Sequence, residues 1–451
     1  MKLGLTDMSR AGRRLGCLLL TVLFLLTLPG EGPLHAREFS PLPEAFDIRV
    51  RTVYTFDRHH VWIDRVTTGQ ASVDAALADA IALLEQQARP LLTSRSRQLE
   101  ITASWRGSGT SLASFLLISR VTVKRETQWM DFRCLTFDLE TGEQLQLSDL
   151  FGRDSPAYEV IGQAVRQSLS RMYPQEDKPA QALDALGAPG QASRLPFMVG
   201  TYQLSFPVAL WQLLPERYQL SQAVVYYDQL LPYVRADMAA QLDNTAYKVL
   251  ALTFDDGPVG GYTRNAVKTL GHHGAVGTFF VIGTCVRASP EGARRAADAG
   301  NPLGGHSMYH KYGYQIKAEM VPEDHALFVQ TLQRHTGLSP DLFRAPGGDY
   351  EKYIRNGVDL PHIRWSIIGD PETTTRPSAI AAQVLHNAGH RDIVLLHDNM
   401  KITVESLEEM LAGLRKRGFR LATVEEMFRM QGIALEKGVS YNSAKPGQSA
   451  Q

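Results

Sequence analysis

The sequence has 451 residues, which corresponds to roughly two or three domains of about 150 residues each. Hydrophobic residues make up 44% of the chain and charged residues 21%, a composition that excludes a wholly disordered protein. Lys plus Arg number 47 and Asp plus Glu number 47, so charge gives no support to a nucleic-acid-binding function. Three cysteines are too few for a disulfide scaffold or a cysteine-based zinc module.

Residues 1–36 have the pattern of a secretory signal peptide. Four basic residues precede an apolar run from Leu15 to Leu28, and Leu34-His35-Ala36 resembles a cleavage site. The run has 14 residues, whereas a membrane-spanning helix needs about 20. We therefore expect an exported protein, periplasmic or associated with the cell wall, with no stable membrane span after cleavage. An uncleaved N-terminal anchor is the alternative.

Residues 45–238 are predicted to form an α+β domain. A helix is expected from residue 72 to residue 90, because the apolar positions between them keep helical spacing. A second helix is expected over residues 158–172, and residues 175–193 are predicted to form a loop. Alternating or β-branched stretches predict strands over 112–124, 129–139, 144–147, 197–206 and 223–227. We find no set of candidate catalytic residues in this part of the sequence.

Residues 245–430 show a different sequence pattern, in which short apolar strands alternate with helices. Helices are expected over stretches such as 263–270 and 406–417. The strands are expected over residues 249–254, 278–282, 342–344, 363–367, 393–396 and 420–424. Such alternation predicts a mainly parallel sheet or barrel, with the active site at the carboxyl ends of its strands. The tail, residues 433–451, is predicted to be disordered.

Polar residues follow several of these strands. Asp255 and Asp256 end the first, within Thr253-Phe254-Asp255-Asp256-Gly257-Pro258. In His306-Ser307-Met308-Tyr309-His310, histidines four residues apart on a helical turn would share a face and reach one metal ion. With one carboxylate they make a ligand set that leaves positions open for water and substrate. Two further motifs are Phe343-Arg344-Ala345-Pro346-Gly347-Gly348 and Ile393-Val394-Leu395-Leu396-His397-Asp398.

These four motifs, in this order, resemble the NodB-type polysaccharide deacetylases, carbohydrate esterase family 4. The resemblance spans about residues 247–428. It implies a distorted (β/α) barrel with fewer than eight strands, here preceded by the smaller α+β domain. Members of the family remove acetyl groups from N-acetylated sugars or from acetyl esters. The resemblance therefore implies a metal-dependent hydrolase.

The resemblance also implies a role for each motif residue. Asp256, His306 and His310 would hold one divalent metal, with zinc as the first candidate and cobalt or manganese as alternatives. Asp255 would be the catalytic base, held by Arg344, and His397 the catalytic acid. Leu395 would contact the acetyl methyl group, and the backbone N–H of Gly347 would stabilise the oxyanion.

Two positions depart from the family pattern. Gly347 stands where the family has an aromatic residue, so it either widens the cleft for a bulky sugar or serves only the turn. Asp370 is the candidate carboxylate that keeps His397 protonated, but it is followed by a proline where the family has Trp, and its spacing is one residue short.

The N-terminal domain has a looser resemblance, carried by residues 138–151 and 227–233. It is similar to a domain of uncharacterised function that precedes the catalytic domain in some peptidoglycan N-acetylmuramic acid deacetylases. We therefore expect a deacetylase of peptidoglycan glycan strands. One alternative is a deacetylase of chitin-like, poly-N-acetylglucosamine or acetylxylan substrates. Another is an inactive sugar-binding or sensor protein.

Overall fold

In the computed structural model, residues 39–172, 185, 187–212, 217–371 and 373–447 can be described. The expected signal peptide, residues 1–36, lies outside this part of the chain, as does most of the loop expected over residues 175–193. Within the described ranges, no helix combines the length and the apolar character that crossing a bilayer requires.

The N-terminal part is built on a six-stranded sheet with the order β1-β2-β3-β4-β5-β6. Its strands are β1 (Arg49–Phe56), β2 (His60–Thr67), β3 (Arg97–Ser108), β4 (Leu112–Val123), β5 (Glu126–Asp138) and β6 (Gln144–Leu145). Neighbouring strands are antiparallel except β2 and β3, which are parallel and are joined through helix α1 (Ala71–Ala88). Strands β1, β2 and β3 have no counterpart among the strands expected from the sequence.

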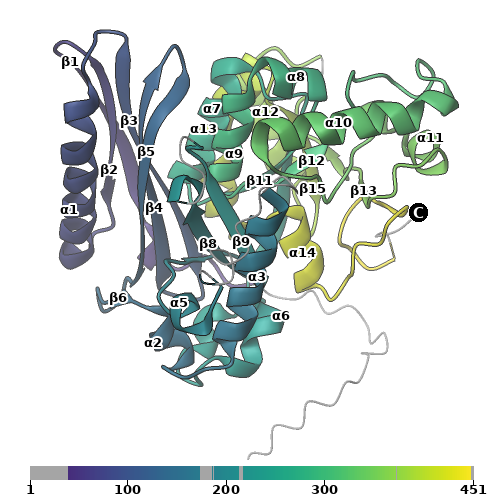
Figure 1. Ribbon diagram of the computed structural model, residues 1–451. Coiled ribbons are helices and arrows are strands. Elements are labelled where there is room, and N and C mark those ends of the chain that lie inside the picture. The colour runs from purple at the N-terminus through teal and green to yellow at the C-terminus, as the bar shows by residue number, and fades with distance from the viewer. Residues whose placement is uncertain (1–38, 173–184, 186, 213–216, 372, 448–451) are drawn as a thin grey trace, which may run out of the picture. The chain divides into compact units, whose positions relative to one another are not determined.

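Helix α1 covers one face of this sheet, because its apolar positions repeat with helical spacing. Its buried residues are Val73, Leu77, Ile81, Leu84 and Ala88, as the periodicity predicts. Along β3, buried residues alternate with half-buried ones, so the strand presents its other face to the rest of the chain. Figure 1 shows α1 on one side of the sheet and helices of the C-terminal part on the other.

A smaller antiparallel sheet, β7-β8-β9, completes the N-terminal part. It packs against α3 (Ala157–Met172), and the expected helix over residues 158–172 is therefore confirmed. The elements are β7 (Met198–Val199), β8 (Gln203–Ala209), β9 (Leu220–Tyr226), and the short helices α2 (Leu147–Phe151), α5 (Pro189–Ala192) and α6 (Tyr227–Leu230).

The C-terminal part is a curled, parallel sheet surrounded by helices. The hydrogen-bonded order is β12-β11-β10-β15-β14, and β16 pairs with the first residues of β10. Single parallel bridges then join Gly305 to Phe343 and Phe343 to His362, so the sheet curls around toward β13. The strands are β10 (Lys248–Asp255), β11 (Gly277–Val281), β12 (Leu303–Gly305), β13 (His362–Ile363), β14 (Ile367–Ile368), β15 (Ile393–His397) and β16 (Phe419–Leu421). This is the distorted barrel with fewer than eight strands that the family resemblance implies.

Helices on the outside explain why the barrel strands are apolar throughout. In β10 every residue from Val249 to Asp255 is buried, as expected for a strand covered on both faces. The helices are α7 (Gly260–His272), α8 (Gly283–Ala288), α9 (Pro290–Asp298), α10 (Val321–Thr336), α11 (Tyr350–Arg355), α12 (Pro377–Asn387), α13 (Lys401–Lys416) and α14 (Val424–Met430). Figure 1 shows α7, α9 and α13 beside the N-terminal sheet.

Ion pairs join the N-terminal sheet to helices α7 and α9. The buried Asp64 carboxylate lies 2.8 Å from His272 Nε2, and the Arg120 guanidinium lies 2.8 Å from Asp298. Removing one partner of a buried ion pair leaves the other charge buried without a partner, which lowers the stability of the fold by about 3–5 kcal/mol. Residues Phe39–Gln451 accordingly form one compact unit, and the division into domains at residues 45–238 and 245–430 stays a prediction.

The expectation of a disordered tail over residues 433–451 is wrong as far as residue 447. Strand β17 (Ser440–Tyr441) pairs in parallel with β13, and Tyr441 and Ala444 are buried. The sequence there is polar and poor in regular patterns, so its pairing with a distant strand leaves no local signal.

Candidate active site

The site lies where barrel strands β10, β12, β14 and β15 end. Asp255 is the last residue of β10, and its neighbours in register are Phe280 on β11 and His397 on β15. The next residue, Asp256, has a φ of 71°, which turns the chain out of the strand and separates the two carboxylates. The carboxyl ends of parallel strands thus bring together residues more than a hundred positions apart.

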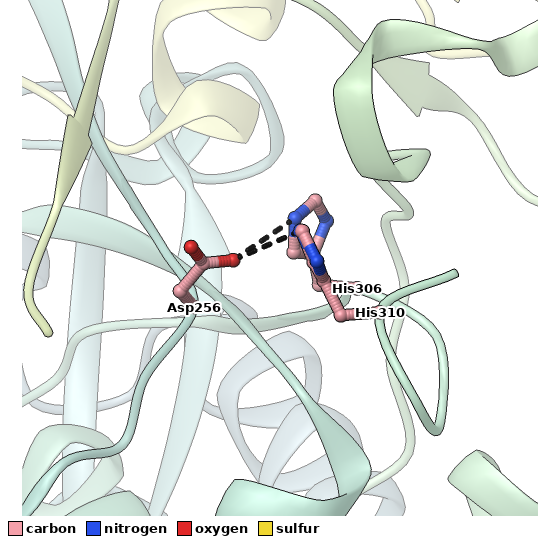
Figure 2. A group of neighbouring side chains, drawn as sticks. All are labelled: Asp256, His306 and His310. Carbon is pink, nitrogen blue, oxygen red and sulfur yellow. Dashed lines mark ion pairs between the residues drawn. The ribbon is translucent and has the colours of Figure 1, made fainter. Parts of the chain in front are cut away.

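Asp256, His306 and His310 form a candidate metal site, called the metal group below. One possible ligand atom from each residue lies within 4.8 Å of the others. Figure 2 shows both imidazoles directed at one carboxylate oxygen of Asp256. This oxygen, Oδ1, lies 3.5 Å from His306 Nε2 and 3.2 Å from His310 Nε2. It is buried, and among the described residues it has no hydrogen-bond partner. A buried carboxylate oxygen facing two imidazole nitrogens fits a divalent cation.

The tautomer of His306 also suits a metal ligand. Its Nδ1 lies 2.7 Å from the backbone carbonyl oxygen of Arg344, which can only accept a hydrogen bond. Nδ1 therefore carries the proton, and in the neutral ring Nε2 directs its lone pair toward Asp256. This orientation by a backbone carbonyl is typical of histidines that bind metals.

The expectation that His306 and His310 share a helical turn is wrong. Residues 306–310 form a loop in which Ser307 and His310 have positive φ angles of 62° and 52°. The backbone N–H groups of Gly283 and Thr284, at the start of α8, bind the carbonyl oxygens of Ser307 and Met308. These contacts replace helical hydrogen bonds, and the two rings still meet, with centroids 4.9 Å apart.

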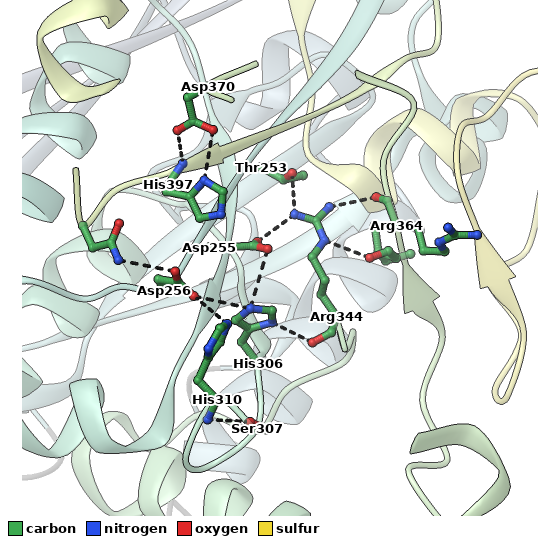
Figure 3. Close-up of polar contacts among 12 residues, drawn as sticks. Thr253, Asp255, Asp256, His306, Ser307, His310, Arg344, Arg364, Asp370 and His397 are labelled. Atoms are coloured by element: carbon green, nitrogen blue, oxygen red, sulfur yellow. Dashed lines mark hydrogen bonds and ion pairs between the residues drawn. The ribbon is translucent and has the colours of Figure 1, made fainter. Parts of the chain in front are cut away.

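Asp255 is paired with the fully buried Arg344 (Figure 3). Arg344 Nη1 donates to Asp255 Oδ1 at 2.7 Å and to the Thr253 hydroxyl at 2.8 Å. Its other nitrogens donate to the carbonyl oxygens of Ile363 and Arg364, both at 2.9 Å. The second oxygen, Oδ2, lies 3.7 Å from His306 Nε2. Asp255 therefore has one oxygen held by Arg344 and the other facing His306.

His397 is the last residue of β15, and Asp370 holds it from the end of β14. Asp370 Oδ1 lies 3.0 Å from His397 Nδ1, and Oδ2 accepts from the His397 backbone N–H at 2.7 Å. Burial acts to lower the pKa of His397, but the hydrogen bond and charge of Asp370 outweigh it and raise the pKa to about 9. The short spacing of this motif and the proline at 371 therefore do not prevent the contact.

The charges at the metal group favour an ionised Asp256. Burial acts to raise its pKa, but the two facing imidazoles, His306 first and then His310, lower the pKa to about 2. Burial and the neighbouring His306 lower the pKa of His310, which favours the neutral ring that a metal ligand requires.

Three polar residues that the sequence analysis did not single out support these groups. Asn399 Nδ2 donates to Asp256 Oδ2 at 3.4 Å, and the Thr403 hydroxyl donates to Asp370 Oδ2 at 2.7 Å. Asp398 is buried beside the Thr263 hydroxyl, and burial raises the pKa of its carboxyl to about 7. Asn399 and Asp398 directly follow His397, which is the signal that could have found them.

The two residues expected to contact the acetyl group and the oxyanion lie on different elements, Leu395 on a strand and Gly347 in a turn. Leu395 lies on β15 and is 6% exposed. Gly347, in the turn Pro346–Gly348, has a φ of 67°, so the turn itself favours glycine. A Cβ at Gly347 would lie 2.5 Å from Tyr312 Cδ1. The space next to this glycine is thus filled by a tyrosine ring from another loop.

Sequence comparison places this arrangement among known proteins. The family model for polysaccharide deacetylase matches residues 243–360. A peptidoglycan-N-acetylglucosamine deacetylase of Bacillus cereus is 34% identical over 194 residues, which are 40% of this chain and 89% of that protein. The chain belongs to the polysaccharide deacetylase family. The matched range contains Asp255, the metal group and Arg344, whereas Asp370 and His397 lie beyond it.

Other deacetylases are similar over the same share of the chain. Peptidoglycan-N-acetylglucosamine deacetylase PgdA of Listeria monocytogenes is 32% identical over 197 residues, and the chain spans only 41% of its length. Peptidoglycan-N-acetylmuramic acid deacetylase PdaC of Bacillus subtilis is 27% identical over 180 residues, 40% of this chain and 38% of PdaC. A solved structure described as a T48 deacetylase with substrate has a TM-score of 0.42 and 27% identity, covering 44% of this chain and 99% of its own.

Proposed function

We propose that this protein is an exported, metal-dependent deacetylase that hydrolyses the N-acetyl groups of amino sugars in peptidoglycan. One observation carries the proposal. A carboxylate with two imidazoles, a second carboxylate held by a buried arginine, and a histidine paired with Asp370 all lie at one edge of the barrel (Figure 3). Membership of the polysaccharide deacetylase family supports the same activity.

Asp256, His306 and His310 would hold the metal ion. A divalent ion bound there supplies polarisation of the acetyl carbonyl and acidification of water. Zinc is the first candidate because the set of one carboxylate and two imidazoles leaves positions open, and cobalt or manganese would also fit.

Asp255 would act as the general base. Arg344 holds its Oδ1, so Oδ2, which faces His306, is the oxygen that can accept a proton from water. The salt bridge also fixes the orientation of the carboxylate, because the guanidinium is itself bound to Thr253 and two carbonyl oxygens.

His397 would act as the general acid. Its Nδ1 proton is bound by Asp370, so the proton on Nε2 is the one available to the leaving amine. With a pKa near 9 the ring is charged at neutral pH, as protonation of an amine requires. Leu395 would contact the acetyl methyl group, and the N–H of Gly347 would stabilise the oxyanion.

The names of the relatives favour peptidoglycan as the substrate. The proteins from B. cereus and L. monocytogenes are named for N-acetylglucosamine and PdaC for N-acetylmuramic acid. Chitin-like glycans, poly-N-acetylglucosamine and acetylxylan are the alternative substrates. A cell-wall substrate also supports export, which the N-terminal pattern of residues 1–36 predicts.

Acetate release tests the proposal. The purified protein, loaded with zinc, is incubated with peptidoglycan glycan strands, chitooligosaccharides and acetylxylan, and the products are identified by mass spectrometry. We expect loss of acetyl groups from peptidoglycan amino sugars, abolished by a chelator. Release from acetylxylan or chitooligosaccharides alone would select the alternative substrates. No acetate from any of the three, with zinc fully bound, would support the sugar-binding alternative.

A further inference from the structure

Two exposed tyrosines follow the metal group in the sequence. Tyr312 is 36% exposed and Tyr314 is 81% exposed, the largest exposure among the large hydrophobic side chains of the described residues. Their rings are stacked, with centroids 5.6 Å apart and planes 6° from parallel. The Tyr314 ring, which is mostly in solvent, contributes little to the core, so core packing does not account for its position.

The pair begins at the metal group and extends away from it. The ring of Tyr312 contacts the ring of His310, with centroids 5.3 Å apart and planes at 73°. Tyr314 is stacked on Tyr312, so His310, Tyr312 and Tyr314 form a row of three rings. A polymer with its acetyl group at His310 would place its next sugar beside the outer rings.

The loop that carries the two rings is fixed in place. Gln315 accepts the Tyr312 backbone N–H at 3.0 Å and donates to the Tyr314 hydroxyl at 3.4 Å. The Tyr353 hydroxyl donates to the carbonyl oxygen of Lys311, and Ile316, two residues after Tyr314 in the sequence, is buried. A fixed ring loses little conformational entropy when a ligand binds to it.

Gly347 gives Tyr312 its position. A Cβ at residue 347 would lie 2.5 Å and 2.7 Å from Cδ1 and Cε1 of the Tyr312 ring, closer than real Cβ contacts allow. Glycine therefore lets the ring lie directly against the turn Pro346–Gly348. The space next to Gly347 is not open, because the Tyr312 ring fills the volume that a side chain at residue 347 would occupy.

We propose that Tyr312 and Tyr314 form an aromatic subsite that binds the sugar ring next to the one being deacetylated. This inference rests on the proposed function, because it takes the acetyl group to lie at the metal group. The axial C–H bonds of a pyranose ring make its faces apolar, and the electron-rich face of a tyrosine ring attracts them. The hydroxyl groups at the sugar's edge stay in water, which suits rings at the surface.

Binding of oligosaccharides tests the subsite without requiring turnover. Calorimetry measures the Kd of N-acetylglucosamine monosaccharide and hexasaccharide for the zinc-loaded Asp255→Asn protein, and for the same protein with Tyr314→Ala, Tyr314→Phe or Phe56→Ala added. Phe56 is the matched control, because it is 62% exposed and lies on β1. Zinc content and thermal unfolding check that each variant is folded.

We expect Tyr314→Ala to weaken hexasaccharide binding by about 10-fold, which corresponds to about 1.4 kcal/mol. Monosaccharide binding should change less, because a single sugar held at the metal group does not reach the subsite. Tyr314→Phe keeps the ring and should bind like the parent, as should Phe56→Ala. Hexasaccharide binding within twofold of the parent in Tyr314→Ala, equal losses on both sugars, or no hexasaccharide binding by the parent would overturn the subsite. Failure of the proposed function is seen separately, as absence of acetate release by the wild-type protein.

Discussion

Replacing Asp370 by Asn removes the negative charge beside His397 while keeping the shape of the side chain. The amide oxygen can still accept from the His397 backbone N–H and from Thr403, so the loop should stay in place. Asp370, with smaller contributions from Asp255 and Asp256, raises the pKa of His397 from 6.5 to about 9 against the effect of burial. Without the charge, the pKa should return to about 6.5 or below.

The expected loss of activity therefore depends on pH. At about pH 8 the protonated fraction of His397 falls from about 0.9 to about 0.03, so kcat/KM should fall about 30-fold. At about pH 6 His397 is mostly protonated in both proteins, and kcat/KM should fall by less than about twofold. The assay is acetate release from glycan strands across the pH range. If kcat/KM declines at the same alkaline pH in both proteins, Asp370 does not set the pKa of His397 and the reasoning is refuted.

The same pair predicts how stability depends on pH. Because the folded chain holds the His397 proton more tightly than the unfolded chain, the pair stabilises fully below about pH 6.5. That contribution is lost as the pH rises from about 6.5 to about 9. The unfolding free energy of the wild-type protein, measured in urea, should fall across this window relative to Asp370→Asn, and parallel curves would contradict the shift.

Further substitutions test other parts of the site. His306→Ala should fold but lose bound zinc in elemental analysis, and full zinc content would contradict the ligand assignment. Arg344→Met leaves the Asp255 carboxylate buried without its partner, so urea unfolding should show a loss of about 3–5 kcal/mol, whereas an unchanged midpoint would mean that the pair contributes nothing. Gly347→Ala should cost about 1–2 kcal/mol because of its positive φ and should also displace the Tyr312 ring, and wild-type stability would show that the turn relaxes freely.

The barrel and its site could be predicted from the sequence because their signals are local. The strand before Asp255 is a short apolar run, and polar residues follow it, as they follow the strands that end at Gly305 and His397. Since parallel strands end at one edge, the motifs had to meet there. The periodicity of α1 was likewise sufficient to identify its buried face.

Other features depend on contacts between distant segments, which local patterns do not encode. The loop at His306–His310 has helical spacing, yet Gly283 and Thr284 hold it as an irregular loop. Strand β3 is a different case, because its alternation of buried apolar and polar residues is a local strand signal that was missed. Tyr312 reaches Gly347 across the site, and no spacing in the sequence links them.

The central claim is that Asp255 is the base of a metal-dependent deacetylation. The most direct measurement is acetate release by Asp255→Asn beside the wild-type protein, with the zinc content of both determined. Asp255 is held by Arg344 and lies outside the group of three that would bind the ion, so the variant should retain zinc. Its rate should fall by at least about 10²-fold. A zinc-loaded Asp255→Asn protein that releases acetate at the wild-type rate would contradict the account.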